Sequence, residues 1–425
     1  MAEKRPTILQ IIPELDAGGA ERTTVEMAEA IVKADGRALV LSEGGRLCGE
    51  VEAVGGEVIR FAAATKNPLR ILTNSRAIAR IIRSEAVDLV HARSRAPAWS
   101  AYLAARRTSA RFVTTYHGIY NEKGRLKRTY NSIMARGDVV IANSDYTAAI
   151  VRERYAVDPA RIVVVNRGVD IDRFDRSNVA ADRIDTLRHA WGIAPGRRII
   201  LHPARLTRWK GQVTVVEAAA ILMRQPGFED VVVVFAGDAQ GRQGYVEELE
   251  ARSSAVGMED RVRFVGHVAD MPAALAMSEM VLIASIEPEA FGRTSVEAQA
   301  MGVPVIATTI GAPPFTVLAP PRHPADCATG RHVPPGNAQA LASAIAEVFR
   351  LNGDERRAMS GRARAHARDN YATRTLQHAT LSVYDRLLGA SLATRFAAVT
   401  AERDTPGNNR SGLTRRGPTG NQASD

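Results

Sequence analysis

The chain has 425 residues, 45% of them hydrophobic, and a formal net charge of +10 at pH 7. This length and apolar content predict two large domains, and the positive charge favours anionic partners such as phosphorylated molecules, acidic lipids or nucleic acid. The only cysteines, Cys48 and Cys327, have no metal-ligand spacing and give no disulfide framework, which is typical of a reducing compartment. We therefore expect a cytoplasmic protein.

The apolar runs along the chain are short. The first, at 8–12, is closed by Pro13 and is too short for the core of a signal peptide. Later runs, such as 139–142 and 231–236, have the length of strands, far below the roughly 18 residues that a membrane-spanning helix requires. Any membrane contact is therefore expected to be peripheral, at the cytoplasmic face of the inner membrane.

Short apolar stretches alternate with longer stretches of helical periodicity, such as 21–34 and 70–84, and this alternation is typical of doubly wound parallel sheets. The two halves of the chain repeat the pattern, which predicts two similar α/β domains. Strands are predicted at 8–12, 37–41, 58–61, 87–91, 112–117, 139–143, 162–165, 199–204, 231–236, 262–265, 281–284 and 305–308.

We place the N-terminal domain at 1–175, a linker at 176–190 and the C-terminal domain at 191–370. The linker is charged and has few large aliphatic residues. A helical segment at 371–390 follows the second sheet, and we hypothesise that it packs back on the N-terminal domain. Residues 391–425 turn to Thr, Arg, Pro, Gly, Asn and Ser, a composition that predicts a disordered tail.

The first candidate site is a strand, a loop with Gly18 and Gly19, and then a helix. Glycine lets a backbone approach a ligand closely, and the first amides of a helix attract phosphate. Gly19 is therefore a candidate pyrophosphate contact, although a plain tight turn explains the same residues equally well. Because the Gly-x-Gly-x-x-Gly spacing of a dinucleotide fold is incomplete, a nicotinamide oxidoreductase is a weaker interpretation.

A second candidate site follows the strand 199–204, at the carboxyl end where such sheets bind ligands. There Arg205 and Lys210 are five residues apart in Arg-Leu-Thr-Arg-Trp-Lys-Gly-Gln. They suit a diphosphate, because each charge-assisted hydrogen bond contributes roughly 1.5–3 kcal/mol. The alternative is a solvated basic loop, to which Arg208 would also belong.

The strongest candidate site is the segment 287–304, which contains Glu-Ala-Phe-Gly-Arg-Thr-Ser-Val-Glu. It predicts a loop and then a helix that begins near Thr294 or Ser295, both competent to cap it, so that Gly292 and the first amides form an anion-binding nest. Glu297 and Glu289 can then accept hydrogen bonds from different parts of one ligand. Taken singly, Glu297 could merely stabilise the helix N-terminus and Glu289 could be a solvated acid.

These motifs resemble the retaining glycosyltransferases of family 4, which have the GT-B architecture of two Rossmann-like domains facing across a cleft. The resemblance covers residues 8–388 and rests on the Glu-x7-Glu motif with its internal Phe-Gly, the Gly-Gly-Ala-Glu-Arg loop, Arg205/Lys210, Ala142-Asn143-Ser144 and Asn166-Arg167-Gly168-Val169-Asp170. It implies transfer of a sugar, with retention of configuration, from a UDP- or GDP-sugar to a glycan or lipid-linked acceptor. Lipopolysaccharide or polysaccharide synthesis would be the setting.

The resemblance also implies roles for individual residues. Gly19, Arg205 and Lys210 would hold the donor diphosphate, Glu297 the ribose, and Glu289, with the amides of Phe291 and Gly292, the transferred sugar. Val268 would lie on the stretch along the nucleobase.

His117 ends the predicted strand 112–117 at the ligand-bearing edge of the first sheet. A lone histidine is more often structural, whereas the resemblance implies that His117 points into the cleft and contacts the donor sugar. Because the donor phosphate is thought to deprotonate the acceptor in retaining enzymes of this type, we expect a positioning role. His117 and Glu289 are the predicted catalytic residues.

Some positions depart from the family pattern. Ala204 replaces a usual glycine, and Arg167 stands between Asn166 and Gly168. The stretch 312–315, Ala-Pro-Pro-Phe, lacks a second glycine and an acidic residue, so we expect the specificity for the sugar to depend on it. The Asp-x-Asp at Asp170 and Asp172 follows a strand, and we interpret these acids as solvated or capping; no metal cofactor is expected.

Basic residues gather in the first domain. They are Arg70, Arg76, Arg80, Arg83, Arg106, Arg107, Arg111, Lys123, Arg125, Lys127, Arg128 and Arg136. They form either a solvated face or a surface that rests on anionic lipid, where each basic group contributes about 1 kcal/mol. The second interpretation suits a lipid-linked acceptor.

Two other functions are consistent with parts of the sequence. A non-catalytic nucleic-acid-binding protein fits the charge, but aromatic residues are only 5% and no basic stretch is interleaved with them, so no nucleic acid is expected as a partner. A nucleotide-sugar epimerase or a sugar phosphorylase would share the fold, and the spacing of Glu289 and Glu297 argues against both.

Overall fold

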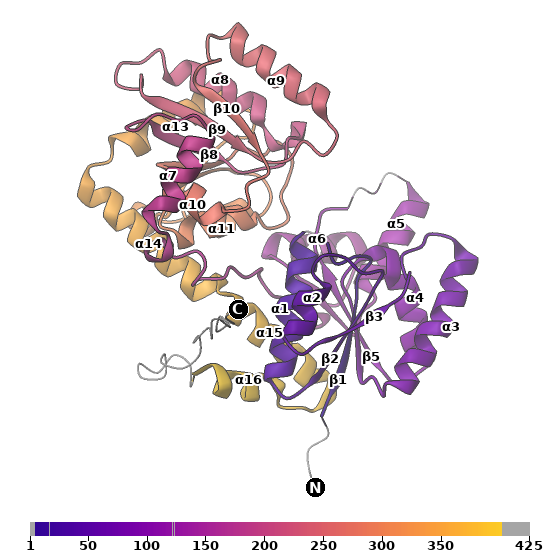
Figure 1. Ribbon diagram of the computed structural model, residues 1–425. Helices are drawn as coiled ribbons and strands as arrows, with labels where there is room; N and C mark the ends of the chain where they lie inside the picture. The colour runs from indigo at the N-terminus through magenta and orange to yellow at the C-terminus, as the bar shows by residue number, and fades with distance from the viewer. Residues whose placement is uncertain (1–4, 17, 121, 123, 402–425) are drawn as a thin grey trace, which may run out of the picture.

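The computed structural model describes residues 5–16, 18–120, 122 and 124–401. Within them the chain forms two α/β domains, the N-terminal one indigo to purple and the C-terminal one magenta to orange in Figure 1. All paired strands of the described residues run parallel. The prediction of two doubly wound parallel sheets is therefore confirmed.

The N-terminal sheet has, in the described part of the chain, seven strands in the order β3-β2-β1-β4-β5-β6-β7. Their bounds are β1 Thr7–Ile11, β2 Arg37–Ser42, β3 Glu57–Arg60, β4 Leu89–Ala92, β5 Arg111–Tyr116, β6 Val139–Ala142 and β7 Ile162–Val164. The helices around it are α1 Gly19–Lys33, α2 Cys48–Ala53, α3 Pro68–Ser84, α4 Arg95–Ala105, α5 Arg125–Asn131 and α6 Asp145–Tyr155. β1 and β6 are buried along their whole length, which is why they show continuous apolar runs in the sequence.

The C-terminal sheet has six strands among the described residues, in the order β10-β9-β8-β11-β12-β13. Their bounds are β8 Arg198–His202, β9 Val231–Ala236, β10 Val262–Gly266, β11 Met280–Ile283, β12 Val305–Thr308 and β13 Gly330–Val333. The helices are α7 Ala181–Ala190, α8 Gln212–Leu222, α9 Gln243–Ala255, α10 Met271–Ala276, α11 Arg293–Ala300, α12 Pro313–Thr316, α13 Ala338–Arg350 and α14 Gly353–Tyr371.

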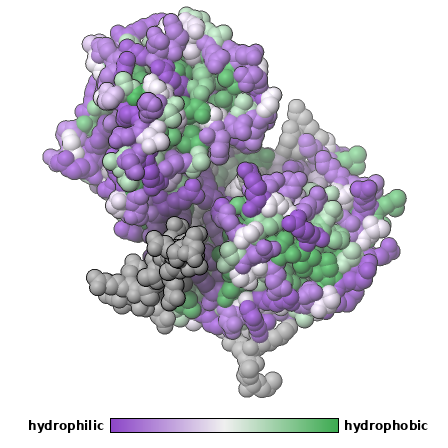
Figure 2. All heavy atoms as spheres, viewed as in Figure 1, coloured by the Kyte–Doolittle hydropathy of each residue, from purple (hydrophilic) through white to green (hydrophobic). Residues whose placement is uncertain are grey.

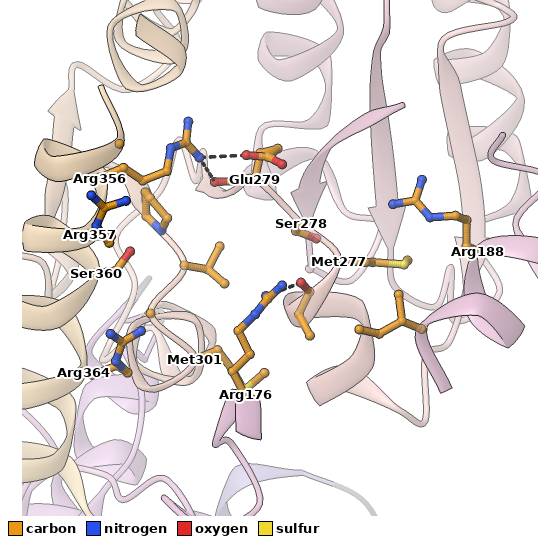
Figure 3. Close-up of a pocket in the computed structure, with 16 residues that line it drawn as sticks. Arg176, Arg188, Met277, Ser278, Glu279, Met301, Arg356, Arg357, Ser360 and Arg364 are labelled. Atoms are coloured by element: carbon orange, nitrogen blue, oxygen red, sulfur yellow. Dashed lines mark hydrogen bonds and ion pairs between the residues drawn. The ribbon is translucent and has the colours of Figure 1, made fainter. Parts of the chain in front are cut away.

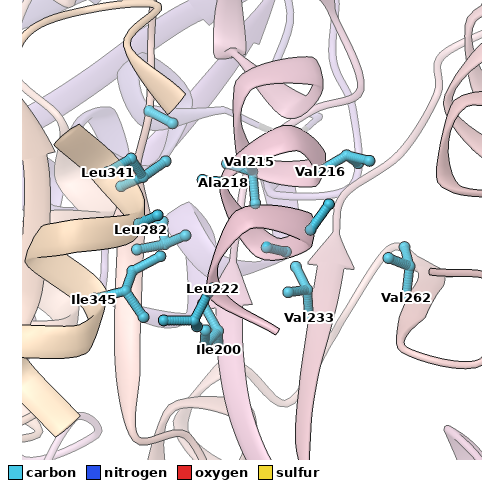
Figure 4. Packing of buried hydrophobic residues seen from close by; sticks show 14 of the residues in the cluster. Ile200, Val215, Val216, Ala218, Leu222, Val233, Val262, Leu282, Leu341 and Ile345 are labelled. Carbon is cyan, nitrogen blue, oxygen red and sulfur yellow. The ribbon is translucent and has the colours of Figure 1, made fainter. Parts of the chain in front are cut away.

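One face of this second sheet packs against α8 and α13, and Figure 4 shows the interface. Ile200 and Leu282 from adjacent strands contact the same cluster as Leu222 of α8 and Leu341 of α13, and all four are at most 1% exposed. At roughly 1.5–3 kcal/mol for each large aliphatic side chain, this core fixes the strands whose carboxyl ends carry the candidate site. Hydrophilic residues cover most of the face of both domains that Figure 2 presents.

The prediction of a linker at 176–190 is wrong for residues 181–190. Residues 181–190 form α7, which packs against α10, and Phe174 and Trp191 are buried in the same core as the C-terminal sheet. The chain passes between the two domains twice, and the two passages meet at Val169. The N–H of Val169 donates to the carbonyl oxygen of Tyr371 at 2.7 Å. The domain boundary thus lies before the charged stretch, because Ile184 and Leu187 of α7 and the flanking Phe174 and Trp191 pack against the C-terminal core.

The last two described helices, α15 Thr373–Leu388 and α16 Leu392–Ala401, lie against α1 of the N-terminal domain (Figure 1). Tyr384 of α15 is fully buried, and its hydroxyl lies 2.6 Å from Nδ1 of His91. The prediction that disorder begins at residue 391 is wrong over 392–401, because Phe396 of α16 is buried in the N-terminal core. The rest of that predicted tail, 402–425, lies outside the described residues, as does Lys123 of the basic surface. None of the described helices is long and apolar enough to cross a membrane.

Candidate active site between the two domains

A cleft of about 640 Å³, here called the interdomain cleft, is lined by loops at the carboxyl ends of both sheets. Parallel strands bring those ends to one edge, so residues far apart in sequence converge there. Seven of the nine predicted site residues line it, namely Gly19, His117, Arg205, Lys210, Glu289, Phe291 and Gly292. The other lining residues include Asn143, Arg167, Trp209 and Arg293, to which sequence reasoning assigned no site role.

Lys210 and Glu289 form an ion pair in the cleft, with Nζ 2.7 Å from Oε1. Both side chains are largely buried, and the hydroxyl of Ser285 also donates to Glu289 Oε1. The backbone of Glu289 is held as well, because its carbonyl accepts the N–H of Ala312 at 2.8 Å. The cation predicted to bind a diphosphate and the carboxylate predicted to bind a sugar are therefore each other's partners in this structure.

His117 is hydrogen-bonded to Arg167, whose Nη2 lies 3.1 Å from His117 Nδ1. Burial lowers the pKa of His117 well below 6.5, so the ring is neutral, and the pKa of Arg167 falls to about 10 for the same reason. Since a guanidinium only donates, Nδ1 accepts and the ring proton is assigned to Nε2. Nε2 has no hydrogen-bond partner among the described residues. His117 is therefore poised to donate a hydrogen bond.

Arg167 follows β7 and packs over the start of α1. A Cβ on Gly19 would collide with the Arg167 guanidinium, so the glycine is needed for this close approach. Arg167 was recognisable in the sequence only as a departure from the family pattern. The structure shows that it occupies the wall of the cleft.

Arg293 joins the two domains. Its Nε donates to Oε1 of Glu297 at 3.0 Å, and its Nη2 lies 3.6 Å from Oε1 of Glu26 on α1. Burial raises the pKa of both carboxyl groups, and Arg293 opposes that shift. A second interdomain contact is the hydroxyl of Ser144, which donates to the carbonyl of Ala290 at 2.6 Å.

Two predicted site residues are not among those that line the cleft. Glu297 lies one turn along α11 and is engaged by Arg293, and Val268 follows β10 and is partly buried against the C-terminal core. The ring of Phe291 is buried with its centroid 5.7 Å from that of Tyr371, so it is packed into the core. The ring of Phe291 is therefore not exposed to the cleft.

The remaining sequence candidates occupy other places. Arg208 pairs with Glu248 and does not line the cleft with Arg205. Asp170 accepts the backbone N–H of Arg173 at 3.0 Å. Within the described ranges, no group of three or more His, Cys, Asp or Glu side chains is arranged to hold a metal ion.

Comparison with known proteins identifies the chain. The sequence family described as Glycosyltransferase Family 4 matches residues 17–173. The family described as Glycosyl transferases group 1 matches residues 183–366. A glycosyltransferase from Rickettsia africae ESF-5, known from a crystal structure, is 35% identical and has a TM-score of 0.83, with coverage of 91% of this chain and 99% of its own. This chain belongs to glycosyltransferase family 4.

Two further proteins that the chain resembles agree with a glycosyltransferase assignment. The crystal structure of Anabaena Alr3699/HepE in complex with UDP-glucose is 26% identical, with a TM-score of 0.74 and coverage of 89% of this chain and 99% of its own. A D-inositol 3-phosphate glycosyltransferase from Actinosynnema mirum is 32% identical over 56% of this chain and 54% of its own length. The match therefore spans little more than half of that relative. The predicted GT-B architecture is confirmed.

Proposed function

We propose that this family 4 member transfers a sugar from a UDP- or GDP-sugar to a glycan or lipid-linked acceptor, with retention of configuration, in cell-envelope polysaccharide synthesis. The observation that carries the proposal is the convergence of Gly19, Arg205, Lys210 and Glu289 on one cleft between the domains. The UDP-glucose complex of the Anabaena neighbour supports a nucleotide-sugar donor.

The proposed transfer breaks the bond between the anomeric carbon and the donor phosphate oxygen and forms one between that carbon and the acceptor oxygen. The acceptor proton passes to the departing phosphate on the same face. Arg205 and Lys210, which both line the cleft, stabilise the negative charge that develops on the diphosphate. His117 positions the sugar by donating from Nε2 and does not act as a base, because Arg167 occupies Nδ1.

We assign Glu289 to the sugar, Glu297 to the ribose and Val268 to the stretch along the nucleobase. Glu297 becomes available when Arg293 gives up one of its two carboxylate contacts. No metal is required, since the two cations already neutralise a diphosphate.

A lipid-linked acceptor is supported by the N-terminal surface. Leu126 is 89% exposed on α5 and Leu69 is 73% exposed on α3. Leu126 and Lys127 line a hollow of about 520 Å³ together with Lys66, so apolar and basic groups are mixed as anionic lipid requires. Sedimentation with acidic liposomes should exceed that with neutral ones and should decrease with salt; equal binding to both would exclude the lipid surface.

Thermal unfolding in the presence of UDP, GDP and ADP tests the donor site, since a ligand that binds the native state raises stability by mass action. One of the three is expected to raise the melting temperature of the native chain, and Arg205→Ala and Lys210→Ala should remove that rise. Arg208→Ala is the matched control, because this neighbour pairs with Glu248 outside the cleft. An unchanged rise in both cleft variants would contradict the proposal.

A further inference from the structure

A second hollow, of about 600 Å³, lies on the C-terminal domain at the end of its sheet that is opposite the interdomain cleft. Its wall includes residues 276–279 and 301–304, which lead into β11 and β12, whereas the cleft residues follow the carboxyl ends of β8 and β11. In a parallel sheet these are opposite ends. The hollow is therefore separate from the proposed donor site.

Arginine dominates the lining of this hollow, which we call the arginine pocket. Its charged lining residues are Arg176, Arg188, Glu279, Arg356, Arg357 and Arg364. Figure 3 shows Arg356, Arg357, Ser360 and Arg364 along α14 on one side, Arg188 on the other side and Arg176 between them. Five positive charges thus face one negative charge.

Two of the five arginines are compensated by acids. Arg356 Nη1 lies 2.8 Å from an oxygen of Glu279, and Arg357 pairs with the exposed Asp354 on its own helix. An exposed ion pair such as Arg357–Asp354 contributes little to stability, and the guanidinium can exchange Asp354 for another anion.

Three arginines keep their charge uncompensated by a salt bridge among the described residues. Arg176 donates to the carbonyl of Ala276 at the end of α10, and Arg188 Nη1 lies 3.3 Å from two backbone carbonyl oxygens. Carbonyl acceptors hold a guanidinium in place without neutralising it. No salt bridge of the Arg364 side chain is found among the described residues, although its charge acts on the carboxylate of Asp175. Arg364 packs over Gly302, where a Cβ would collide with it.

The helix geometry makes this arrangement rigid. Arg356, Ser360 and Arg364 follow at intervals of four and therefore share one face of α14. Met359 and Ala363, on the adjacent face, are buried, and α14 packs against α11. The arginines are thus presented by a helix whose other side is part of the core.

We propose that the arginine pocket binds a phosphate-bearing small molecule. Guanidinium groups match the geometry of phosphate oxygens through forked hydrogen bonds, and a hollow of this volume accommodates a ligand the size of a sugar phosphate. A purely structural role, in which the arginines bind backbone carbonyl oxygens, accounts for Arg176, whose acceptor is at the end of α10, and for Arg188, whose acceptors lie on the loop after α7. It does not account for Arg364, for which no such carbonyl contact is found among the described residues.

The pocket also has a direct structural route to the interdomain cleft. Arg293, in the first turn of α11, lines the cleft, and Met301, just after its last turn, lines the pocket. An eight-residue helix at 1.5 Å per residue separates the two by roughly 12 Å. Ligand binding at the pocket is therefore placed to influence the cleft through a single rigid element.

Isothermal titration with inorganic pyrophosphate tests the proposal without knowledge of the sugar donor. The native chain is expected to bind at two sites, and Arg205→Ala/Lys210→Ala should leave one. Adding Arg176→Gln/Arg364→Gln to that variant should weaken the remaining binding at least about tenfold, since two charge-assisted contacts are lost. Arg368→Gln is the control, because Arg368 is exposed on the same helix, pairs with Asp369 and does not line the pocket.

Loss of all pyrophosphate binding in Arg205→Ala/Lys210→Ala would overturn the arginine pocket while leaving the proposed donor site intact. Equal affinity with and without Arg176→Gln/Arg364→Gln would also overturn it; Arg364→Gln alone repeats the test without disturbing the Arg176 contact. Sedimentation with phosphatidylglycerol vesicles then distinguishes the source of the phosphate. A lipid headgroup is the ligand if pyrophosphate competes with the vesicles in an Arg364-dependent way, and a free molecule is the ligand if vesicle binding does not depend on Arg364.

Discussion

Replacement of Arg167 by Met should make the protein more stable and less active. The burial of this guanidinium lowers its pKa from 12.5 to about 10, which at 1.36 kcal/mol per pKa unit corresponds to roughly 3 kcal/mol against the charged form. The lost hydrogen bond to His117 Nδ1 costs about 1 kcal/mol. The variant should therefore gain about 2 kcal/mol in the free energy of unfolding, because a methionine of similar length carries no charge into the site.

In differential scanning calorimetry, this gain should raise the melting temperature of the N-terminal domain by roughly 4–8 °C. Sugar transfer should fall at least about tenfold, since the His117 ring loses the partner that fixes its tautomer. Arg152→Met, at an exposed position of α6 in the same domain, is the control and should change neither quantity. A lower melting temperature together with full activity would refute the reasoning.

Three further predictions concern the fold and the chemistry. Phe396→Ala should cost roughly 3–5 kcal/mol in denaturant unfolding, since its ring is 2% exposed in the N-terminal core; a loss below about 1 kcal/mol would mean that α16 is not part of that core. Burial lowers the pKa of His202 to about 4, so between pH 6.5 and pH 4 only the unfolded state takes up this proton. Its contribution of roughly 3 kcal/mol should be complete above pH 6.5 and decline as the pH falls to 4, whereas in His202→Gln urea unfolding at pH 7 and pH 5 should differ less. EDTA should leave sugar transfer unchanged, and activity that returns only with added Mg²⁺ would contradict the metal-free proposal.

Most strands were predictable because they are buried along nearly their whole length and therefore read as short apolar runs, as in β1, β6, β9 and β12. Twelve of the thirteen strands in the described residues coincide with predicted apolar runs. The exception is β13, where the partly buried Arg331 and His332 interrupt the run at the edge of the sheet. α16 was missed for a different reason. Its apolar residues are buried only when it packs against α15 and α1, so tertiary contacts rather than the local sequence pattern stabilise this helix.

The cleft was predictable to the extent that it depends on strand ends. Gly19, His117, Lys210 and Glu289 follow strands of parallel sheets, and a parallel sheet gathers such residues at one edge. Side-chain pairing across the cleft could not be predicted in this way. The contact of Arg293 with α1 depends on how closely two separately folded domains approach, which no local pattern encodes.

The pairing inside the cleft suggests how the proposed donor would enter. A buried cation and a buried carboxylate are costly unless each has a partner, and Lys210 and Glu289 satisfy one another. A diphosphate that takes Lys210 leaves Glu289 without its cation, while a sugar attached to the same diphosphate offers hydroxyl groups to that carboxylate. A free nucleotide supplies the diphosphate for Lys210 but no sugar hydroxyl groups for Glu289. Under the proposed function, the Lys210–Glu289 pair therefore favours the intact nucleotide-sugar over the free nucleotide, and it does so before any residue contacts the specific hydroxyls that distinguish one sugar from another.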